Sequence, residues 1–276
     1  MALPNPLVNE AQAAEAFTKQ SAIFDRLYSR DAIVQYKRES VRSHVTRFME
    51  PNSKILELNS GTGEDAVWFA QRGHFVHATD LSQGMQDELR TKIQALGLGG
   101  QVSQELCSFT ALDALANKGP YDMIFSNFAG LNCTADIKKV LQSFFPLLRP
   151  GGLVTLVILP SCCFWELMLA FKGKWKTALR RLVSHGGASA RVEGRYFTCW
   201  YYNPSKVRKF LGKRYKQILL EGLCTIVPPS YIIGFGENHP RLFKALVKWE
   251  KRLKGTWPWR SIGDYYIISF KKMDNN

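Results

Sequence analysis

Residues 54–66, KILELNSGTGEDA, join a short apolar segment to two glycines and then to two acidic residues. An apolar run that stops at glycine is typical of a buried strand entering a tight turn, because glycine adopts backbone conformations that other residues avoid. In α/β sheets, the first turn from a strand into a helix is where ligands bind. The stretch therefore predicts a strand at 54–58, a helix at 65–72 and a binding site between them.

Strand and helix patterns alternate along the rest of the first 160 residues. We expect further strands at 74–80, 102–106, 121–126 and 153–159, and further helices at 38–49, 83–96 and 136–145. This alternation is typical of an α/β protein whose largely parallel sheet is doubly wound, with helices on both faces.

The composition is that of a globular chain. With 276 residues and 46% apolar content, it is long enough for one large core. No apolar segment approaches the roughly 20 residues needed to cross a bilayer, and the first residues lack a basic segment followed by an apolar one, so we expect a cytoplasmic protein. The six cysteines show no paired C-x-x-C spacing, so we expect reduced thiols and no metal site.

The excess positive charge lies entirely in the C-terminal part of the chain. Residues 1–160 hold 15 basic and 16 acidic residues, a net −1, whereas residues 161–276 hold 22 and 7, a net +15. This asymmetry indicates an acidic partner for the second part, which could be an anionic substrate, a membrane surface or nucleic acid. The alternative is a solvated basic face.

The acidic residues around the turn distinguish between cofactors. GTGEDA alone is a weak match to the dinucleotide motif, and a pyrophosphate at the helix terminus would meet Glu64 and Asp65. S-adenosylmethionine (SAM) brings a cation and no phosphate, and Glu57 could face its ammonium or sulfonium group. Asp80, 23 positions after Glu57, suits a carboxylate that accepts both ribose hydroxyls. Separately, Glu57 or Asp80 could also be a capping or surface acid.

Four segments together resemble the class I SAM-dependent methyltransferase family over about residues 54–159: LELNSGTGEDA, ATDLSQGM, YDMIFSNFAGLN and LLRPGGLVTLVI. The resemblance implies a Rossmann-like, doubly wound, seven-stranded sheet, mostly parallel with an antiparallel last strand. Its final hairpin would use 215–222 and 264–272. The chain departs from the family pattern at Asn59, where glycine is common, and at 107–109, where an acidic residue that bonds the adenine amine is common. Here Ser108 or a backbone group could supply that bond.

The resemblance also implies the residues that bind SAM and its product S-adenosylhomocysteine. They follow the first four strands: Glu57, Asn59, Ser60, Gly61, Thr62, Gly63, Asp80, Leu81, Met85, Cys107, Ser108, Phe109, Ser126, Asn127 and Phe128. For Met85 and Phe128 a role in the core is the alternative. We also expect residues 24–42 to close over the cofactor, where Tyr28, Tyr36, Lys37 or Arg38 could meet its carboxylate, and among these we select Tyr36.

Two basic, aromatic segments, 161–203 and 223–263, are not explained by the core fold, so we expect them to be inserted substrate lids. The alternative is helices that simply pack on the core. The domain organisation is then a helical cap at 1–50, a SAM-binding core at 51–160, and a part at 161–276 that completes the sheet and carries the insertions. The candidate substrate-binding residues are Asn132, Trp165, Tyr196, Phe197, Tyr201, Tyr202 and Tyr231.

The leading functional hypothesis is methyl transfer from SAM to a small-molecule or lipid-like acceptor, with possible peripheral contact to an acidic membrane surface. Alignment can supply much of the acceleration, and His239 and His185 are the candidate bases if a proton must leave, although a loop histidine is often only a surface residue. An RNA methyltransferase is the runner-up, disfavoured because SNFA at 126–129 is not an N/D-P-P-Y/F tetrad. A nicotinamide oxidoreductase and a non-enzymatic SAM-binding protein are the remaining alternatives.

Overall fold

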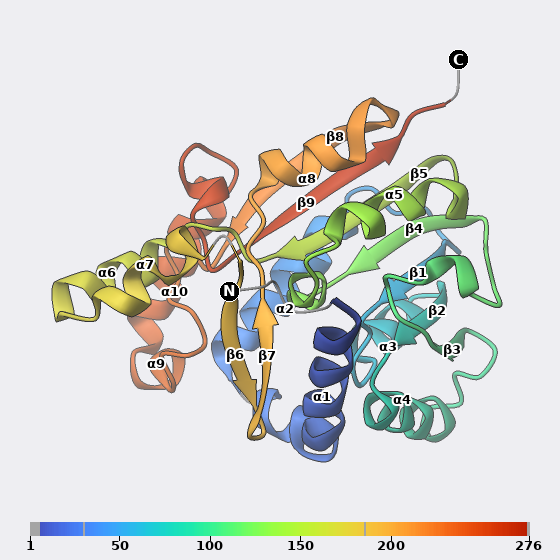
Figure 1. Cartoon of the computed structure of the whole chain (residues 1–276), viewed down its shortest axis with the longest axis horizontal. Helices are drawn as coiled ribbons and strands as arrows, with labels where there is room; N and C mark the ends of the chain where they lie inside the picture. The colour runs from blue at the N-terminus through green and yellow to red at the C-terminus, as the bar shows by residue number, and fades with distance from the viewer. Residues whose placement is uncertain (1–5, 30, 185, 275–276) are drawn as a thin grey trace.

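A seven-stranded sheet forms the centre of the protein in its computed structural model, which describes residues 6–29, 31–184 and 186–274 (Figure 1). The strand order is β3-β2-β1-β4-β5-β9-β8. The strands in chain order are β1 (Lys54–Leu58), β2 (Phe75–Asp80), β3 (Val102–Leu106), β4 (Tyr121–Ser126), β5 (Leu148–Ile158), β8 (Tyr215–Leu223) and β9 (Tyr265–Lys272). The first five are parallel, and β9 is antiparallel to both of its neighbours. The predicted fold class is confirmed.

Helices cover both faces of the sheet because side chains alternate along each strand. In β1, Leu56 and Leu58 belong to the apolar cluster that includes α5 (Ile137–Leu147) and α8 (Pro204–Leu211). Ile55 faces the other way, into a second cluster with α2 (Ala32–Val45), α3 (Glu64–Ala70) and α4 (Gln83–Ala95). Glu57 has the same parity as Ile55, so this carboxylate points to the face covered by α2 and α3.

Most of the predicted elements are present, with shifts at their ends. The strands at 102–106 and 121–126 have the predicted bounds, but β5 begins at Leu148 rather than at residue 153. The helix predicted at 38–49 begins earlier, at Ala32, because Asp31 caps it by accepting a hydrogen bond from the Val34 N–H.

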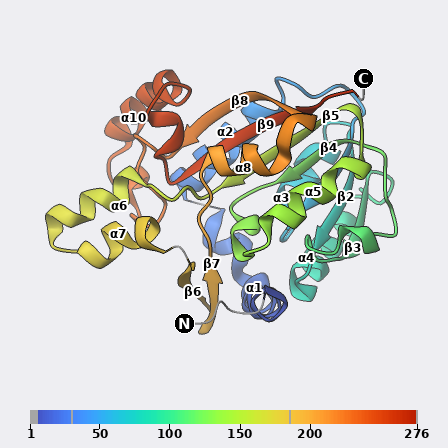
Figure 2. The ribbon, with the colours of Figure 1, turned by 45° about the horizontal axis from the view of Figure 1, so that its top comes forward.

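A long helix and a hairpin lie together across the carboxyl ends of the strands (Figures 1 and 2). The helix is α1 (Pro6–Tyr28), and the hairpin consists of β6 (Ala188–Val192) and β7 (Arg195–Cys199). Asn9 joins them: its amide donates to the Cys133 and Thr198 carbonyls and accepts from the Thr198 N–H. The rings of Phe17 and Phe197 lie 5.9 Å apart in the same contact. These two elements, 189 residues apart at the Asn9 contact, form one cover.

The other inserted helices project together at one end of the molecule (Figures 1 and 2). They are α6 (Phe164–Met168), α7 (Trp175–Val183), α9 (Phe235–Asn238) and α10 (Pro240–Leu253). Buried Arg181 of α7 is paired with Glu166 and with Asp264, which directly precedes β9. Glu250 of α10 is fully buried and accepts hydrogen bonds from four successive backbone N–H groups, those of residues 224–227.

The buried pair His44–Glu221 predicts a loss of stability in acid. The His44 Nδ1 lies 2.7 Å from a Glu221 oxygen, and Arg47 and Lys254 also contact this carboxylate. Burial alone would raise the pKa of Glu221, but the bond to His44 and the charge of Lys254 outweigh it and lower the pKa from 4.5 to about 2. Burial also lowers the pKa of His44 below 6.5.

Both folded-state pKa values lie below the unfolded ones, so the two contributions are complete above pH 6.5 and are lost as the pH falls toward 2. We expect the free energy of unfolding, measured by urea titration, to fall steadily over this range. Glu221→Gln should weaken this dependence below pH 4.5. Asp87→Asn, which removes the exposed pair with Arg90, should leave the profile unchanged, and an equal effect of both variants would contradict the assignment.

Candidate functional site

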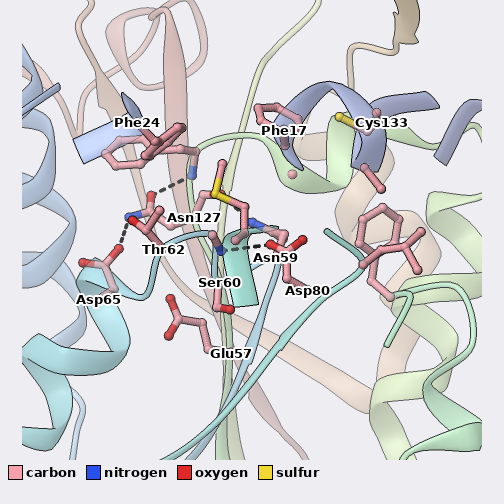
Figure 3. Close-up of a pocket in the computed structure, with 18 of the residues that line it drawn as sticks. Phe17, Phe24, Glu57, Asn59, Ser60, Thr62, Asp65, Asp80, Asn127 and Cys133 are labelled. Carbon is pink, nitrogen blue, oxygen red and sulfur yellow. Dashed lines mark hydrogen bonds between the residues drawn. The ribbon is translucent and has the colours of Figure 1, made fainter. Parts of the chain in front are cut away.

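A cavity opens at the carboxyl ends of β1, β2 and β4, beneath α1 (Figure 3). Eleven residues predicted to bind the cofactor line it: Glu57, Asn59, Ser60, Gly61, Thr62, Asp80, Leu81, Met85, Phe109, Asn127 and Phe128. The other lining residues are Glu10, Ala13, Ala14, Phe17, Phe24, Arg38, Glu64, Asp65, Gly130 and Cys133. The cavity therefore lies where the sequence predicted the cofactor site, and the roles of its residues remain predictions.

The glycine turn shapes the floor of this cavity. Gly61 has φ +55°, and a Cβ built on it would meet nothing within 4 Å, because it would project into open space. Gly63 has φ +80°, and its Cβ would lie 2.2 Å from the Leu89 Cδ1 atom of α4. The first glycine thus leaves room at the cavity, whereas the second lets the turn pack against a helix.

Asn59 holds the turn to the neighbouring strand. Its φ of +48° lies in the left-handed region, which asparagine tolerates better than most residues. Its side-chain amide donates to the Asn127 carbonyl, and its Oδ1 accepts from the Ser126 hydroxyl. A Cβ at Gly130 would collide with this amide at 2.1 Å. Asparagine at this family glycine position is therefore accommodated by Gly130, and it links the ends of β1 and β4.

Asp80 stands at the end of β2 and ties that strand to the turn. One carboxylate oxygen accepts from the Gly61 N–H at 2.9 Å, and the other accepts from the Ser82 N–H at 2.8 Å. Burial raises the pKa of this carboxyl, and the backbone donors oppose that effect. The two N–H groups fix the carboxylate in the cavity wall, where its remaining lone pairs can accept from hydroxyl groups.

Glu57 is an incompletely satisfied carboxylate in the same wall. Its side chain is 2% exposed, and its Oε2 has no hydrogen-bond partner among the described residues. Burial, followed by the charge of Asp65, raises the pKa of Glu57 well above its ordinary value. A buried oxygen without a donor is costly, so this position favours a ligand that brings a cation or an N–H group.

Glu64 and Asp65, the two acids after the glycine turn, form ion pairs with basic residues of the protein. Glu64 pairs with Arg38 of α2 and with Lys92 of α4, and Asp65 pairs with Arg42 of α2. These pairs offset part of the negative charge that a pyrophosphate at the helix terminus would meet. All four acids, Glu57, Asp80, Glu64 and Asp65, line the cavity, but Glu57 and Asp80 form no ion pair among the described residues.

The N-terminal helix supplies cavity residues that were not selected from the sequence, although Phe24 belongs to the segment 24–42 that was expected to close over the cofactor. Glu10, Ala13, Phe17 and Phe24 face the site from α1. They recur at intervals of three, four and seven residues, which places them on one face of a helix. That spacing was the available signal, but the sequence does not indicate which surface the helix covers.

Several predicted cofactor residues do not line the cavity. Ser108 adjoins it and donates to Glu10, while Ser126 bonds to Asn59. Cys107 is buried, and burial raises its pKa to about 11. The Tyr36 hydroxyl donates to Glu250 on the far side of α2, whereas Arg38 of the same helix reaches the cavity.

The predicted substrate residues also lie outside the cavity lining. The side-chain amide of Asn132 and the hydroxyl of Tyr202 donate hydrogen bonds to backbone carbonyls. Phe197 packs behind Phe17, while Tyr196 is 60% exposed. The remaining members, Trp165, Tyr201 and Tyr231, belong to or adjoin the projecting helical part.

The structure describes one of the two candidate bases. His239 is exposed at the start of α10, and no histidine among the described residues lines the cavity. His185 lies outside the described residues. The described part of the chain also contains no cluster of three or more residues suited to hold a metal ion. None of the described helices is long and apolar enough to span a membrane.

Comparisons with known proteins agree with this fold. Residues 55–152 match the family model described as "Methyltransferase domain". The chain is 33% identical over 105 residues to tRNA 5-carboxymethoxyuridine methyltransferase of Escherichia coli (strain K12), covering 38% of this chain and 39% of that protein. A ubiquinone/menaquinone biosynthesis C-methyltransferase of Cronobacter sakazakii is 33% identical over 103 residues, covering 36% and 39%. The chain thus spans about two fifths of the length of these relatives.

Solved structures share the fold over nearly the whole chain. Burkholderia thailandensis 1,6-didemethyltoxoflavin-N1-methyltransferase, with bound S-adenosylhomocysteine, has a TM-score of 0.59 at 15% identity, covering 99% of this chain and 93% of its own. The [4+2]-cyclase SpnF has a TM-score of 0.62 at 12% identity, covering 97% of each. The second example shows that this fold does not by itself fix the reaction. Together, these observations show that residues 55–152 match a methyltransferase domain and that the chain has the fold of a solved methyltransferase that binds S-adenosylhomocysteine.

Proposed function

We propose that the protein is a SAM-dependent methyltransferase that acts on a small-molecule or lipid-like acceptor. The observation that carries this proposal is the cavity itself. Its wall combines the open Gly61 turn, the fixed carboxylate of Asp80 and the unpartnered oxygen of Glu57 within the methyltransferase domain.

Each part of SAM has lining residues that are suited to it. Asp80 would accept from the ribose hydroxyls, and Leu81, Met85 and Phe109 would enclose the base. At the other end, Glu57 would face the ammonium group. Arg38, which is 6% exposed and whose Nε has no partner among the described residues, would meet the carboxylate.

When bound, SAM supplies a methyl group on a cationic sulfur, and transfer is an in-line displacement. The protein's own task is then to hold the acceptor on the line of the breaking bond and to exclude water. Because no histidine among the described residues lines the cavity, we assign catalysis to alignment rather than to His239. The turn at Asn127 and Phe128, held by Asn59 and Asp65, would position the acceptor.

We assign acceptor selection to the inserted segments 161–203 and 223–263. The β6–β7 hairpin of the first segment supports the cavity wall directly, because Phe197 packs against Phe17 of α1. Phe197 therefore contacts a side chain that lines the cavity, and a substitution of Phe197 would alter the cavity wall through that contact.

An exposed apolar stripe on α7 favours a lipid-like acceptor or contact with a lipid surface. Trp175, Leu179, Leu182 and Val183 recur at helical spacing and are each at least 40% exposed. Lys172, Lys174 and Lys176 adjoin this stripe. Apolar residues beside basic ones suit the boundary of an acidic lipid layer, which we propose as a peripheral contact.

RNA is the second candidate acceptor, supported by the net charge of +15 over residues 161–276 and by the similarity to a tRNA methyltransferase. To distinguish the two, the protein would be incubated with SAM carrying a labelled methyl group and with separate lipid, small-molecule and RNA fractions. We expect the label in the lipid or small-molecule fraction, and none with Asp80→Ala, which removes the proposed ribose acceptor. Label in RNA would overturn the assigned acceptor, and label in no fraction would count against the methyltransferase proposal.

A further inference from the structure

Glu10 reaches from α1 to the end of β3 and is held there by two hydroxyl groups. Its Oε2 accepts from the Ser108 hydroxyl at 2.5 Å and from the Thr110 hydroxyl at 2.9 Å. The Ser108 hydroxyl also accepts from the Thr110 N–H, which fixes its own position. The carboxylate is therefore oriented by residues 98 and 100 positions away in the sequence.

The second oxygen of Glu10 is unsatisfied. The residue is only 4% exposed, it lines the cavity, and its Oε1 has no hydrogen-bond partner among the described residues. Leu81, Met85 and Phe109 line the cavity as well and offer no strong donor. A buried acceptor in such surroundings costs free energy unless a ligand brings an N–H or O–H group.

The sheet order places Glu10, which is held by Ser108 after β3, on the other side of Asp80 from Glu57. Strands β3, β2 and β1 are neighbours, so Glu10, Asp80 and Glu57 stand at the ends of three adjacent strands. The Cys107 N–H donates to the Asp80 carbonyl, which joins the end of β3 directly to that of β2. A ligand whose diol meets Asp80 and whose cation meets Glu57 would direct its other end toward Glu10.

We propose that the Glu10 Oε1 accepts a hydrogen bond from the exocyclic amine of the cofactor's adenine base. This inference rests on the proposed function, since it assigns one end of the same cavity. The chain has Cys107, Ser108 and Phe109 directly after β3 and no carboxylate among them. Ser108 instead holds a carboxylate delivered by α1, so base recognition requires that α1 be docked.

The test compares two ligands that differ at this amine. The wild-type protein would be titrated calorimetrically with S-adenosylhomocysteine and with S-inosylhomocysteine, which carries a carbonyl in place of the amine. We expect the adenosyl ligand to bind roughly tenfold more tightly, because the carbonyl would confront a second acceptor. Glu10→Gln should remove most of this preference, since its amide can donate to the carbonyl.

Glu15→Gln is the matched control, because Glu15 lies on α1 but is exposed and pairs with Arg195. It should keep the wild-type preference. Equal binding of the two ligands by the wild-type protein would overturn the inference without requiring any variant. Failure of the wild-type protein to bind S-adenosylhomocysteine would instead overturn the proposed function, and the role of Glu10 with it.

Discussion

Gly61→Val is expected to weaken S-adenosylhomocysteine binding by at least roughly a hundredfold, or about 2.7 kcal/mol. Gly61 lines the cavity and a Cβ on it would meet no protein atom within 4 Å, so we expect the branched side chain to occupy the space proposed for the ligand. The Gly61 N–H also donates to Asp80, and a shift of the turn would move that carboxylate as well. Calorimetric titration of the folded variant measures the loss.

Gly97→Val separates the effect of the cavity from that of backbone strain. Gly97 has φ +65°, close to the +55° of Gly61, and its Cβ would likewise meet nothing within 4 Å. It is exposed after α4 and does not line the cavity. This variant should share the strain but keep the wild-type affinity. Tight binding by Gly61→Val would mean that the ligand lies elsewhere.

Glu250→Ala is expected to lower the free energy of unfolding by at least about 4 kcal/mol. Its carboxylate is the acceptor for the N–H groups of residues 224–227 and for the Tyr36 hydroxyl. Removing it would leave these donors unsatisfied, and Cys224, Thr225 and Val227 are fully buried. Urea unfolding followed by circular dichroism would measure the change.

Two further variants make this expectation specific. Glu250→Gln keeps one acceptor but turns an amide donor toward the N–H groups, so it should destabilise the protein by an intermediate amount. Lys251→Ala, at an exposed position of the same helix, should change stability by less than about 0.5 kcal/mol. Equal stability of Glu250→Ala and Lys251→Ala would show that the donors find other partners.

The parts of the site predicted from sequence are those encoded by neighbouring residues. Gly61 lies in the turn after β1 and Asp80 ends β2, so the adjacency of these two strands was enough to bring them together. The antiparallel pairing of the last two strands followed from the family resemblance, and the pairing of β8 with β9 confirms it.

The rest of the site depends on contacts between distant segments. Glu10 is oriented by residues about 100 positions away, and Tyr36 is engaged by Glu250, 214 positions away. Local patterns of apolar and polar residues indicate that a helix exists, but its docking surface is decided by packing across the whole chain. The same holds for the cover, because Asn9 is matched to backbone groups at Thr198.

The docking of α1 and α2 on the sheet limits how this protein can be divided. The segment matched to the methyltransferase domain, 55–152, excludes Glu10, Arg38 and Arg42. A fragment cut at those bounds would leave Glu64 and Asp65 without the arginines of α2. The segment 55–152 therefore lacks two helices that contribute to the site, and a chimera built on this sheet should include both α1 and α2.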